Sequence, residues 1–216
     1  GKPRKGGVFA MEIKEGDELI QAKISNGTDN IIMATREGKS IRFKEEEVRA
    51  TGRRTRGVKG IKIGKKDAVI GMLVLKNDGH VLVASENGYG KRSNLDEYRT
   101  HNRSGKGVYT LKSTEKTGKL VSILEVLDSD DIMIITNQGV MIRQQVSAIN
   151  TIGRNTQGVK LINLKELSLE WNEITKIENL DNLVNLQKLN LSKNKIGKIE
   201  NLDKLVNLKE LHLQNH

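Results

Sequence analysis

One frame of residues recurs three times in this chain, and every copy contains two arginines. A glycine is followed by an arginine four positions later, a second arginine at fifteen, and Gly-Val at nineteen and twenty. The copies begin at Gly38, Gly88 and Gly139, so the period is 50 and then 51 residues. A fixed period of this length is typical of repeat architectures, in which each repeat packs on its neighbours. The sequence therefore predicts a row of similar units, each with a pair of cations.

Each repeat is predicted to consist of strands and turns. Short apolar runs rich in β-branched residues precede the turn glycines, at 31–34, 81–84 and 132–135. The glycine supplies the positive φ of a hairpin turn, after which the chain returns in a second strand such as 40–43. Two more strands are expected, one after the Gly-Val pair and one starting nineteen residues before the turn glycine. About four strands per repeat is typical of propeller blades, whose sheets bury both faces against their neighbours.

The repeated arginines are predicted to form a cationic surface. Alternation in the second strand places Ile41 and Phe43 on one face, so Arg42 is expected to point away from the core, as are Arg92 and Arg143. A single surface arginine is usually only solvated. Arginines that support the fold are expected to pair with repeated acids, but the nearby acids have no third copy. Strict repetition therefore favours a shared role in binding.

The distribution of charge indicates a polyanionic partner. Residues 165–216 carry eight lysines and eight acids, so the whole net charge of +10 belongs to residues 1–164. An excess confined to one segment suggests a polyanion. Aromatic residues make up only 3% of the chain, which argues against binding of single strands by base stacking. The backbone of a nucleic-acid duplex is the better candidate.

Other classes of protein are disfavoured by what the sequence lacks. It has no cysteine, its four histidines are scattered, and no apolar run approaches the ~18 residues of a membrane span. The glycine-rich turns do not match a phosphate-binding frame, and no arrangement of side chains suggests catalysis. We therefore expect no catalytic residue, metal, cofactor or membrane association. The N-terminal residues 1–4 lack the apolar region of an export signal, which predicts a cytoplasmic location.

Several stretches in the first three quarters of the chain resemble one family. They are 16–20, 41–43, 48–50, 87–92 and 153–159. They occur in the order and at the spacing of the C-terminal domain of DNA gyrase A, a propeller-like β-pinwheel. The resemblance covers about residues 2–164 and implies an all-β domain, residues 1–164, of about three four-stranded blades.

This resemblance implies a function as well as a fold. The family's domain is not an enzyme by itself; it binds and wraps duplex DNA and supports negative supercoiling by the ATP-dependent gyrase holoenzyme, a type II topoisomerase. The implied partners are double-stranded DNA, the remainder of gyrase A, and gyrase B, in the bacterial nucleoid. The matching cations, expected to contact DNA, are Arg42, Arg53, Arg54, Arg56, Lys59, Lys91, Arg92, Arg103, Lys106, Arg143, Arg154 and Lys160. Two alternatives stay open: a topoisomerase IV C-terminal domain, or a scaffold that binds proteins.

One hallmark of the gyrase family is missing. The gyrase box, Gln-Arg-Arg-Gly-Gly-Lys-Gly, does not occur, and residues 4–7 are only a partial echo of it. By spacing the box is expected upstream of Gly1, together with the first blade or more. The sequence leaves open whether DNA is wrapped or only bound without these parts.

A second period of 22 residues begins near Asn163. It places leucines at 167, 189 and 211 and asparagines at 172 and 194. This pattern resembles leucine-rich repeats, so residues 165–216 are predicted to form a short solenoid tail whose asparagines bond the backbone inside each bend. A closing blade strand expected near residue 170 is replaced by this pattern, and Trp171 is expected to pack at the junction. The tail is a candidate for binding a protein partner, and its origin, natural or engineered, stays open.

Overall fold

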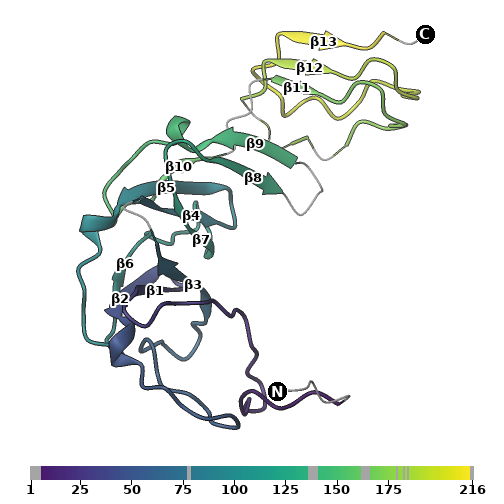
Figure 1. The fold of residues 1–216 in the computed structure, drawn as a ribbon. Helices are drawn as coiled ribbons and strands as arrows, with labels where there is room; N and C mark the ends of the chain where they lie inside the picture. The colour runs from purple at the N-terminus through teal and green to yellow at the C-terminus, as the bar shows by residue number, and fades with distance from the viewer. Residues whose placement is uncertain are drawn as a thin grey trace. The chain divides into compact units, whose positions relative to one another are not determined.

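The structure is a computed structural model that describes most of the chain (Figure 1). The described residues are 6–76, 79–135, 141–161, 166–178, 180–181, 183 and 185–214. They form strands and three short 3-10 turns, which confirms the predicted all-β class. The chain divides into two compact units, residues 1–132 with 144–161 and residues 133–143 with 162–216.

The first unit contains two four-stranded antiparallel sheets. The first sheet has the order β3 (Val69–Leu75), β1 (Asn30–Thr35), β2 (Lys39–Lys44) and β6 (Val108–Tyr109). The second has the order β7 (Leu120–Val126), β4 (His80–Ser85), β5 (Tyr89–Asn94) and β10 (Val159–Lys160). Their turn glycines have the predicted positive φ, 82° at Gly38 and 73° at Gly88, while Gly139 lies outside the described residues.

Each sheet is completed by strands from the following repeat. β3 lies just before the hairpin β4–β5 in the chain, yet it pairs with β1, with Ile32 opposite Leu73. β7 pairs with β4 in the same way, with Leu82 opposite Leu124. β6 and β10 fill the other edge of each sheet, against β2 and β5. The repeats are therefore joined by backbone hydrogen bonds as well as by packing.

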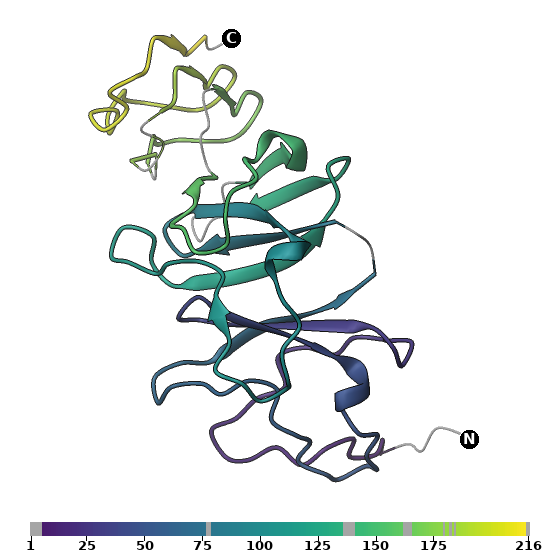
Figure 2. The same ribbon diagram turned by 90° about the vertical axis from the view of Figure 1, so that its left-hand side faces the viewer.

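The core of the first unit lies where the two sheets stack (Figure 2). Ile32 and Leu73 of the first sheet and Val81 and Leu120 of the second belong to one buried cluster. Complete burial of such side chains stabilises the fold by about 1.5–3 kcal/mol each. A second cluster, which includes Ile41 and Phe43, lies on the opposite face of the first sheet. The first sheet thus buries both faces, as a propeller blade does.

A third hairpin follows the two sheets. It comprises β8 (Asp131–Ile135) and β9 (Met141–Gln145), which form a two-stranded sheet within the described residues. Each of the three hairpins runs into a 3-10 turn: η1 (Glu45–Glu47), η2 (Leu95–Glu97) and η3 (Val146–Ala148). The closing strand expected near residue 170 does not join this hairpin in the described structure, because the chain there enters the leucine-rich pattern.

The tail forms three parallel strands, β11 (Glu166–Ser168), β12 (Lys188–Asn190) and β13 (Glu210–His212). Their register matches residues 22 apart, such as Leu167, Leu189 and Leu211. The leucines of this period form one buried cluster. The predicted domain boundary between residues 164 and 165 lies outside the described residues and stays a prediction.

Asparagine side chains hold the bends of the tail. The amide of Asn194 donates to the carbonyl oxygens of Leu169 and Leu191 at 2.8 and 2.9 Å, and its oxygen accepts from the backbone N–H of Ile174 at 3.0 Å. The predicted role of these asparagines is therefore confirmed. The prediction for Trp171 is wrong: its side chain is 75% exposed, with the ammonium of Lys193 over its ring at 5.2 Å.

Candidate nucleic-acid interface

Arg92 lies inside the protein, although the repeat pattern predicts that it faces DNA. The residue is only 8% exposed. The guanidinium donates to the carbonyl oxygens of Ile149 and Ser147 and to the carboxylate of Asp128. These partners belong to the following repeat and its approach, so Arg92 connects two repeats. Its buried position excludes it from a DNA surface.

Arg42 occupies the equivalent position one repeat earlier and makes the same kind of contact. Its Nη1 donates to the carbonyl oxygens of Leu95 and Tyr98 at 3.3 and 3.2 Å, while Nε donates to Oδ1 of Asn30 at 3.3 Å. Its side chain is half-buried. Hydrogen bonds from a charged donor contribute about 1.5–3 kcal/mol each. Arg42 and Arg92 therefore hold the 3-10 turn of the next repeat in place, and the prediction that they point freely outward is corrected.

Lys91 is the second correction, because its side chain is completely buried. Its ammonium donates to the carbonyl oxygens of Gly153 and Arg154 and to Oγ1 of Thr156, the last at 2.9 Å. Burial lowers the pKa of Lys91 to about 8, and the charge of Arg154 acts in the same direction. Lys91 therefore joins two repeats and cannot contact a phosphate.

Arg103, at the second arginine position of the repeat, reaches back to the preceding repeat. Its Nη1 donates to the carbonyl oxygen of Lys59 and its Nε to that of Glu47, the latter at 3.1 Å. The Glu47 carboxylate in turn accepts from the backbone N–H of Arg103 at 2.7 Å. Arg103 is half-buried, and its Nε and Nη1 are directed at protein carbonyls.

Arg154 repeats the contacts of Arg103 one repeat later. It donates to the carbonyl oxygens of Tyr109 and Glu97 at 2.6 and 3.2 Å, and its backbone N–H donates to the Glu97 carboxylate at 2.6 Å. In the inner repeats, both arginine positions therefore stabilise the fold. A structural arginine is expected from the sequence to pair with repeated acids, but the guanidinium partners here are mostly backbone carbonyls, which leave no trace in the sequence.

The remaining predicted cations are accessible. Arg53 is the first copy of the second arginine position and is exposed, as is Arg143, the last copy of the first position. Lys160 is half-buried. The other exposed members of the predicted set are Arg54, Arg56, Lys59 and Lys106.

Positive charge is concentrated in three segments that follow the 3-10 turns. We name residues 49–66, 99–119 and 150–160 the connector segments. They contain sixteen lysines and arginines and one acid, Glu115, whereas the net charge of the whole chain is +10. The connector segments therefore account for more than the entire excess of positive charge.

Most of these cations are solvent-exposed, and the repeat pattern predicts only some of them. Of the connector cations, Arg56 pairs with Glu12 at 2.6 Å and Lys119 with Glu37 at 2.7 Å. The exposed cations that the repeat pattern misses are Arg49, Lys62, Lys65, Lys66, Arg99, Lys112 and Lys116. The signal that marks them is the near absence of acids from the connector segments, not the repeat register.

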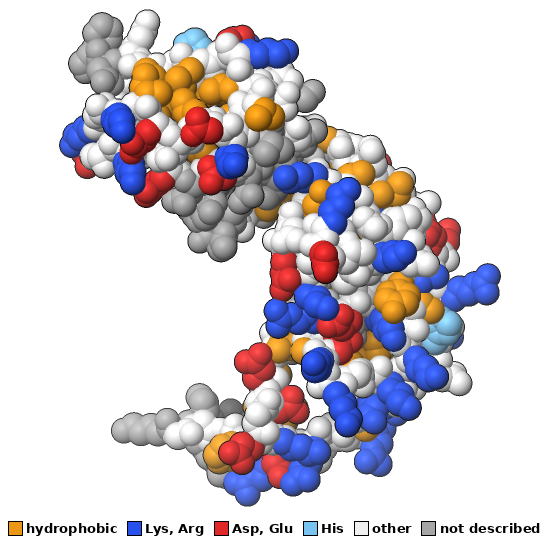
Figure 3. All heavy atoms as spheres, turned by 180° about the vertical axis from the view of Figure 1, so that it is seen from behind, with side chains coloured by type: hydrophobic (Ala, Val, Ile, Leu, Met, Phe, Trp, Pro, Cys, Tyr) orange, Lys and Arg blue, Asp and Glu red, His pale blue; other side chains and the backbone are white. Residues whose placement is uncertain are grey.

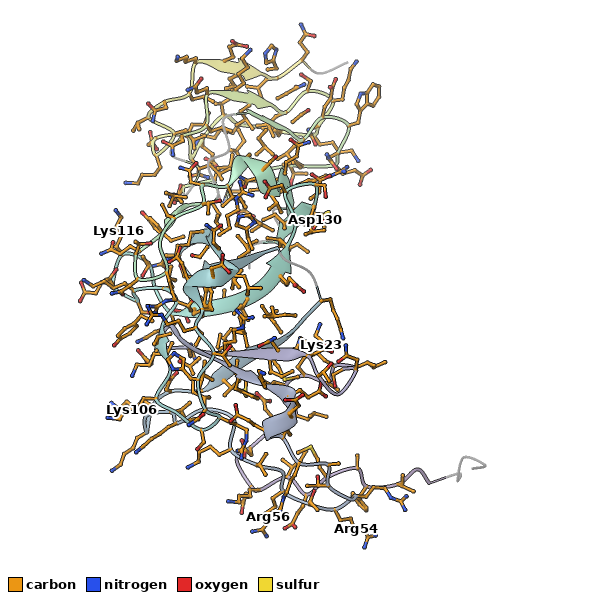
Figure 4. All side chains as sticks on the ribbon, turned by 60° about the vertical axis from the view of Figure 1, so that its left-hand side comes forward. Lys23, Arg54, Arg56, Lys106, Lys116 and Asp130 are labelled. Carbon is orange, nitrogen blue, oxygen red and sulfur yellow. The ribbon has the colours of Figure 1, made fainter. Side chains whose placement is uncertain are left out.

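The figures show how these cations project. Lys106 and Lys116 extend away from the sheets on one side, whereas Lys23 and Asp130 lie on the other (Figure 4). Arg54 and Arg56 project from the loop near the N-terminal end (Figure 4). In the space-filling view, Lys and Arg side chains outnumber acids over the lower right of the visible face (Figure 3). An exposed surface of this kind suits contact with many phosphates.

Two other kinds of site are absent from the described ranges. No cluster of three or more His, Asp or Glu side chains there is placed to hold a metal ion. None of the helical segments in the described part of the chain is long and apolar enough to cross a membrane.

The sequence matches two family profiles. The family described as DNA gyrase C-terminal domain, beta-propeller, matches residues 2–26, 29–76, 79–126 and 130–166. The family described as leucine-rich repeats, two copies, matches residues 162–204 and 184–216.

Known proteins resemble the first of these regions in sequence and in fold. The DNA gyrase A protein of Halalkalibacterium halodurans is 61% identical over 163 residues, which are 76% of this chain and 20% of that protein. A solved DNA gyrase A C-terminal domain superposes with a TM-score of 0.67 at 28% identity, covering 72% of this chain and 54% of that one. A solved C-terminal domain of DNA topoisomerase IV has the same TM-score at 23% identity, covering 70% and 48%, and this likeness concerns the fold alone.

The chain spans about a fifth of the length of the curated relatives that it matches. The profile match covers well over half of the chain and includes all three hairpins. Together with the blade sheets, it shows that the chain belongs to the DNA gyrase C-terminal domain family, with leucine-rich repeats after it.

Proposed function

We propose that this chain is a non-catalytic module that binds and wraps duplex DNA through the connector segments. The observation that carries the proposal is their sixteen cations against one acid. Lysine and arginine that neutralise phosphates release condensed counterions, which gives affinity without sequence preference. The proposed contacts keep Arg53, Arg54, Arg56, Lys59 and Lys106 from the predicted set, and they omit Lys91 and Arg92 because these are buried.

The spread of cations over successive repeats suits a bent duplex. Bending a duplex of 20–30 base pairs costs about 1–6 kcal/mol, which many weak phosphate contacts must offset. Arg103 and Arg154 add a second role, because they fix the positions of the connector segments relative to the neighbouring repeats. A rigid row of cations loses less conformational entropy when it binds than flexible loops do.

The proposed cellular role follows from the family. Within a DNA gyrase A protein, wrapping by this domain supports negative supercoiling together with the remainder of gyrase A and with gyrase B. The proposed location is on DNA in the bacterial cytoplasm. The leucine-rich tail is neutral overall, so we assign it no share of the DNA contact; a protein partner for it belongs to the proposal.

A titration of the chain with duplex DNA at several salt concentrations tests the binding step. The logarithm of the association constant is expected to fall linearly with the logarithm of salt concentration, with a slope of about −0.9 per phosphate neutralised. Single-stranded DNA of the same length is expected to bind more weakly. A shallow slope on duplex DNA contradicts the proposal and favours the protein scaffold.

Two matched triple variants locate the contact. Lys62, Lys65 and Lys66 are exposed in a connector segment, and their replacement by Gln is expected to reduce the salt slope by about 2–3. The control replaces Lys195, Lys204 and Lys209, which are exposed in the tail, and removes the same charge. An equal loss in both variants means that only net charge matters, which contradicts a localised interface.

Wrapping is separated from simple binding by DNA topology. A nicked circle is sealed by ligase with the chain bound, and the linking number is compared with that of naked DNA. Wrapping is expected to shift the linking number in proportion to bound protein. Binding with an unchanged linking number contradicts wrapping and leaves binding intact.

A further inference from the structure

Two of the three tyrosines have hydroxyl groups that no residue in the described ranges binds. Tyr109 is 46% exposed and Tyr89 is half-buried, and neither hydroxyl has a hydrogen-bond partner there. Tyr98, by contrast, is 1% exposed, and its hydroxyl shares a hydrogen bond of 2.6 Å with Oγ1 of Thr110. A phenolic hydroxyl can donate as well as accept a hydrogen bond. The hydroxyls of Tyr89 and Tyr109 are therefore available to a ligand.

The two tyrosines occupy the same place in the two four-stranded sheets, although they come from different strands. In the first sheet, Tyr109 of β6 lies opposite Lys39 of β2. In the second sheet, Tyr89 of β5 lies opposite Lys160 of β10. Lys39 and Tyr89 each follow a turn glycine, while Tyr109 and Lys160 each follow a Gly-Val pair. The two residue types are exchanged between the strands, and each sheet keeps one of each at this edge.

An ammonium group lies over the ring of each tyrosine. The ammonium of Lys39 is 5.5 Å from the centre of the Tyr109 ring, and that of Lys116 is 5.4 Å from the centre of the Tyr89 ring. The negative face of an aromatic ring attracts a cation in this position. Such a contact uses the face of the ring and leaves the hydroxyl free. Each tyrosine therefore presents a neutral donor beside a positive charge.

Both tyrosines lie among the connector segments. Tyr109 belongs to the segment 99–119, and its carbonyl oxygen accepts from Nη1 of Arg154 at 2.6 Å. Tyr89 lies between two connector lysines, Lys160 on the neighbouring strand and Lys116 over its ring. Lys116 extends away from the sheets on the same side as Lys106 (Figure 4). The free hydroxyls are therefore surrounded by the cations that the proposed function assigns to DNA.

We propose that Tyr89 and Tyr109 contact the duplex by donating their hydroxyls to phosphate oxygens, each beside a lysine that neutralises the same stretch of backbone. This inference rests on the proposed function and adds an uncharged contact to it. Tyrosine is among the side chains that bond phosphates in protein–DNA complexes, and a charged acceptor strengthens such a bond. A hydroxyl donates over a limited range of angles, whereas an ammonium acts as a compact point charge. The tyrosines thus orient the duplex on each sheet.

Removal of the two hydroxyls tests this contact in a salt titration with duplex DNA. Tyr89→Phe with Tyr109→Phe keeps both rings, and with them the contacts to the lysines. Affinity is expected to fall about tenfold, the scale of one net hydrogen bond to a charged group. The salt slope is expected to stay unchanged, because no cation is removed and the same counterions are released. The Gln variant of Lys62, Lys65 and Lys66 is the reference, since its slope is expected to fall.

Trp171→Phe in the tail is the matched control. Trp171 is 75% exposed, and the ammonium of Lys193 lies over its ring at 5.2 Å. The substitution removes one donor, the ring N–H, and keeps an aromatic ring beside a lysine. Affinity for duplex DNA is expected to be unchanged, because the tail carries no net charge. Circular dichroism checks the folding of every variant.

The possible results separate this inference from the proposed function. Parental affinity in the tyrosine variant, with a reduced slope in the lysine variant, overturns the inference and leaves the proposed function intact. A reduced slope in the tyrosine variant also overturns it, because the rings then act only through their lysines. An equal loss of affinity in Trp171→Phe overturns it as well. A shallow slope in the parent chain contradicts the proposed function, and the inference fails with it.

Fluorine NMR of the chain labelled with 3-fluorotyrosine observes the same groups directly. The three tyrosines give three resonances, which the single Phe variants assign. Duplex DNA is expected to shift the resonances of Tyr89 and Tyr109 and to leave that of Tyr98, which is buried and bonded to Thr110. Resonances of Tyr89 and Tyr109 that stay in place in saturating DNA, or an equal shift of all three, overturn the proposal.

Discussion

The 50-residue repeats and the 22-residue repeats both use side chains to bond the backbone of irregular segments, but the side chains differ. In the first, Arg92 and Arg154 donate to backbone carbonyls of neighbouring repeats. In the second, Asn194 bonds carbonyls and an N–H inside a bend. Both devices satisfy backbone groups that irregular segments leave unpaired. The two kinds of contact differ in charge. The arginines make the junctions between the 50-residue repeats basic, whereas the asparagines leave the tail neutral.

A side chain that recurs in strict register is therefore one that holds the repeats together. The residues that vary between copies are then the better candidates for binding. Lys62, Lys65 and Lys66 are not repeated in all three copies, yet they are exposed in a segment free of acids. Variants at both kinds of position separate structural cations from binding cations.

The largest expected effect is that of Arg92→Ala. It removes the guanidinium from a buried site and leaves the Ile149 carbonyl and Asp128 without this donor. The free energy of unfolding is expected to fall by about 4 kcal/mol, measured by urea denaturation. Arg99→Ala, at an exposed connector position, is the control and is expected to change it by less than about 0.5 kcal/mol. Similar losses in both variants would contradict a structural role specific to Arg92.

The next largest effect on stability is expected at two glycines that share one backbone conformation. Gly107→Ala places a Cβ 2.6 Å from the Ser40 carbonyl oxygen and keeps a positive φ, so a loss of about 3 kcal/mol is expected. Gly57→Ala adds only the strain of positive φ, about 1–2 kcal/mol. Thermal or urea unfolding measures both. Equal losses would show that the contact with the hairpin contributes nothing.

In the tail, Asn194→Ala is expected to lower stability by about 2 kcal/mol. It leaves the backbone N–H of Ile174 and two carbonyl oxygens without their side-chain partner. Hydrogen exchange at Ile174 reports the loss locally. Asn172→Ala is the matched control, with a smaller effect, because the Asn172 amide is exposed and bonds only within its own bend. Unchanged exchange at Ile174 would contradict the role of Asn194.

The last expected effect is a pH dependence of stability that comes from Lys91. Its pKa is about 8 in the fold against an ordinary 10.5, so the unfolded chain binds the proton more tightly. Stability from this group is therefore expected to rise as pH increases from about 8 toward 10. Burial raises the pKa of Tyr98, which lowers stability only once unfolded tyrosine ionises, near pH 10 and above. Lys91→Met is expected to remove the rise, and an identical pH profile in that variant contradicts the assignment.

Much of the fold is predictable from local patterns. The apolar runs and turn glycines place the hairpins, and the leucine period places β11, β12 and β13. The partners of the strands are not visible, because pairing of β3 with the preceding hairpin depends on how repeats stack and not on any residue type. The loss of a closing strand for the third hairpin is visible as a change of period near residue 170.

The candidate site is less predictable, for a physical reason. A guanidinium that binds carbonyl oxygens needs no particular residue as its partner, so Arg92 looks like a free cation in the sequence. Lys91 does leave a signal, since its counterparts are Ile41 and Ile142, both buried. A lysine in a core position of a repeat is held by something inside the protein, and that comparison separates it from a surface cation.

A lysine-acetylation footprint with and without duplex DNA tests the central claim most directly. One sample reports on the connector segments, the buried Lys91 and the tail together. Lys62, Lys65, Lys66, Lys106, Lys112 and Lys116 are expected to be protected by DNA, Lys195, Lys204 and Lys209 to react equally with and without it, and Lys91 to stay unreactive in both states. Protection of the tail lysines, or unchanged reactivity of the connector lysines in saturating DNA, would contradict the account.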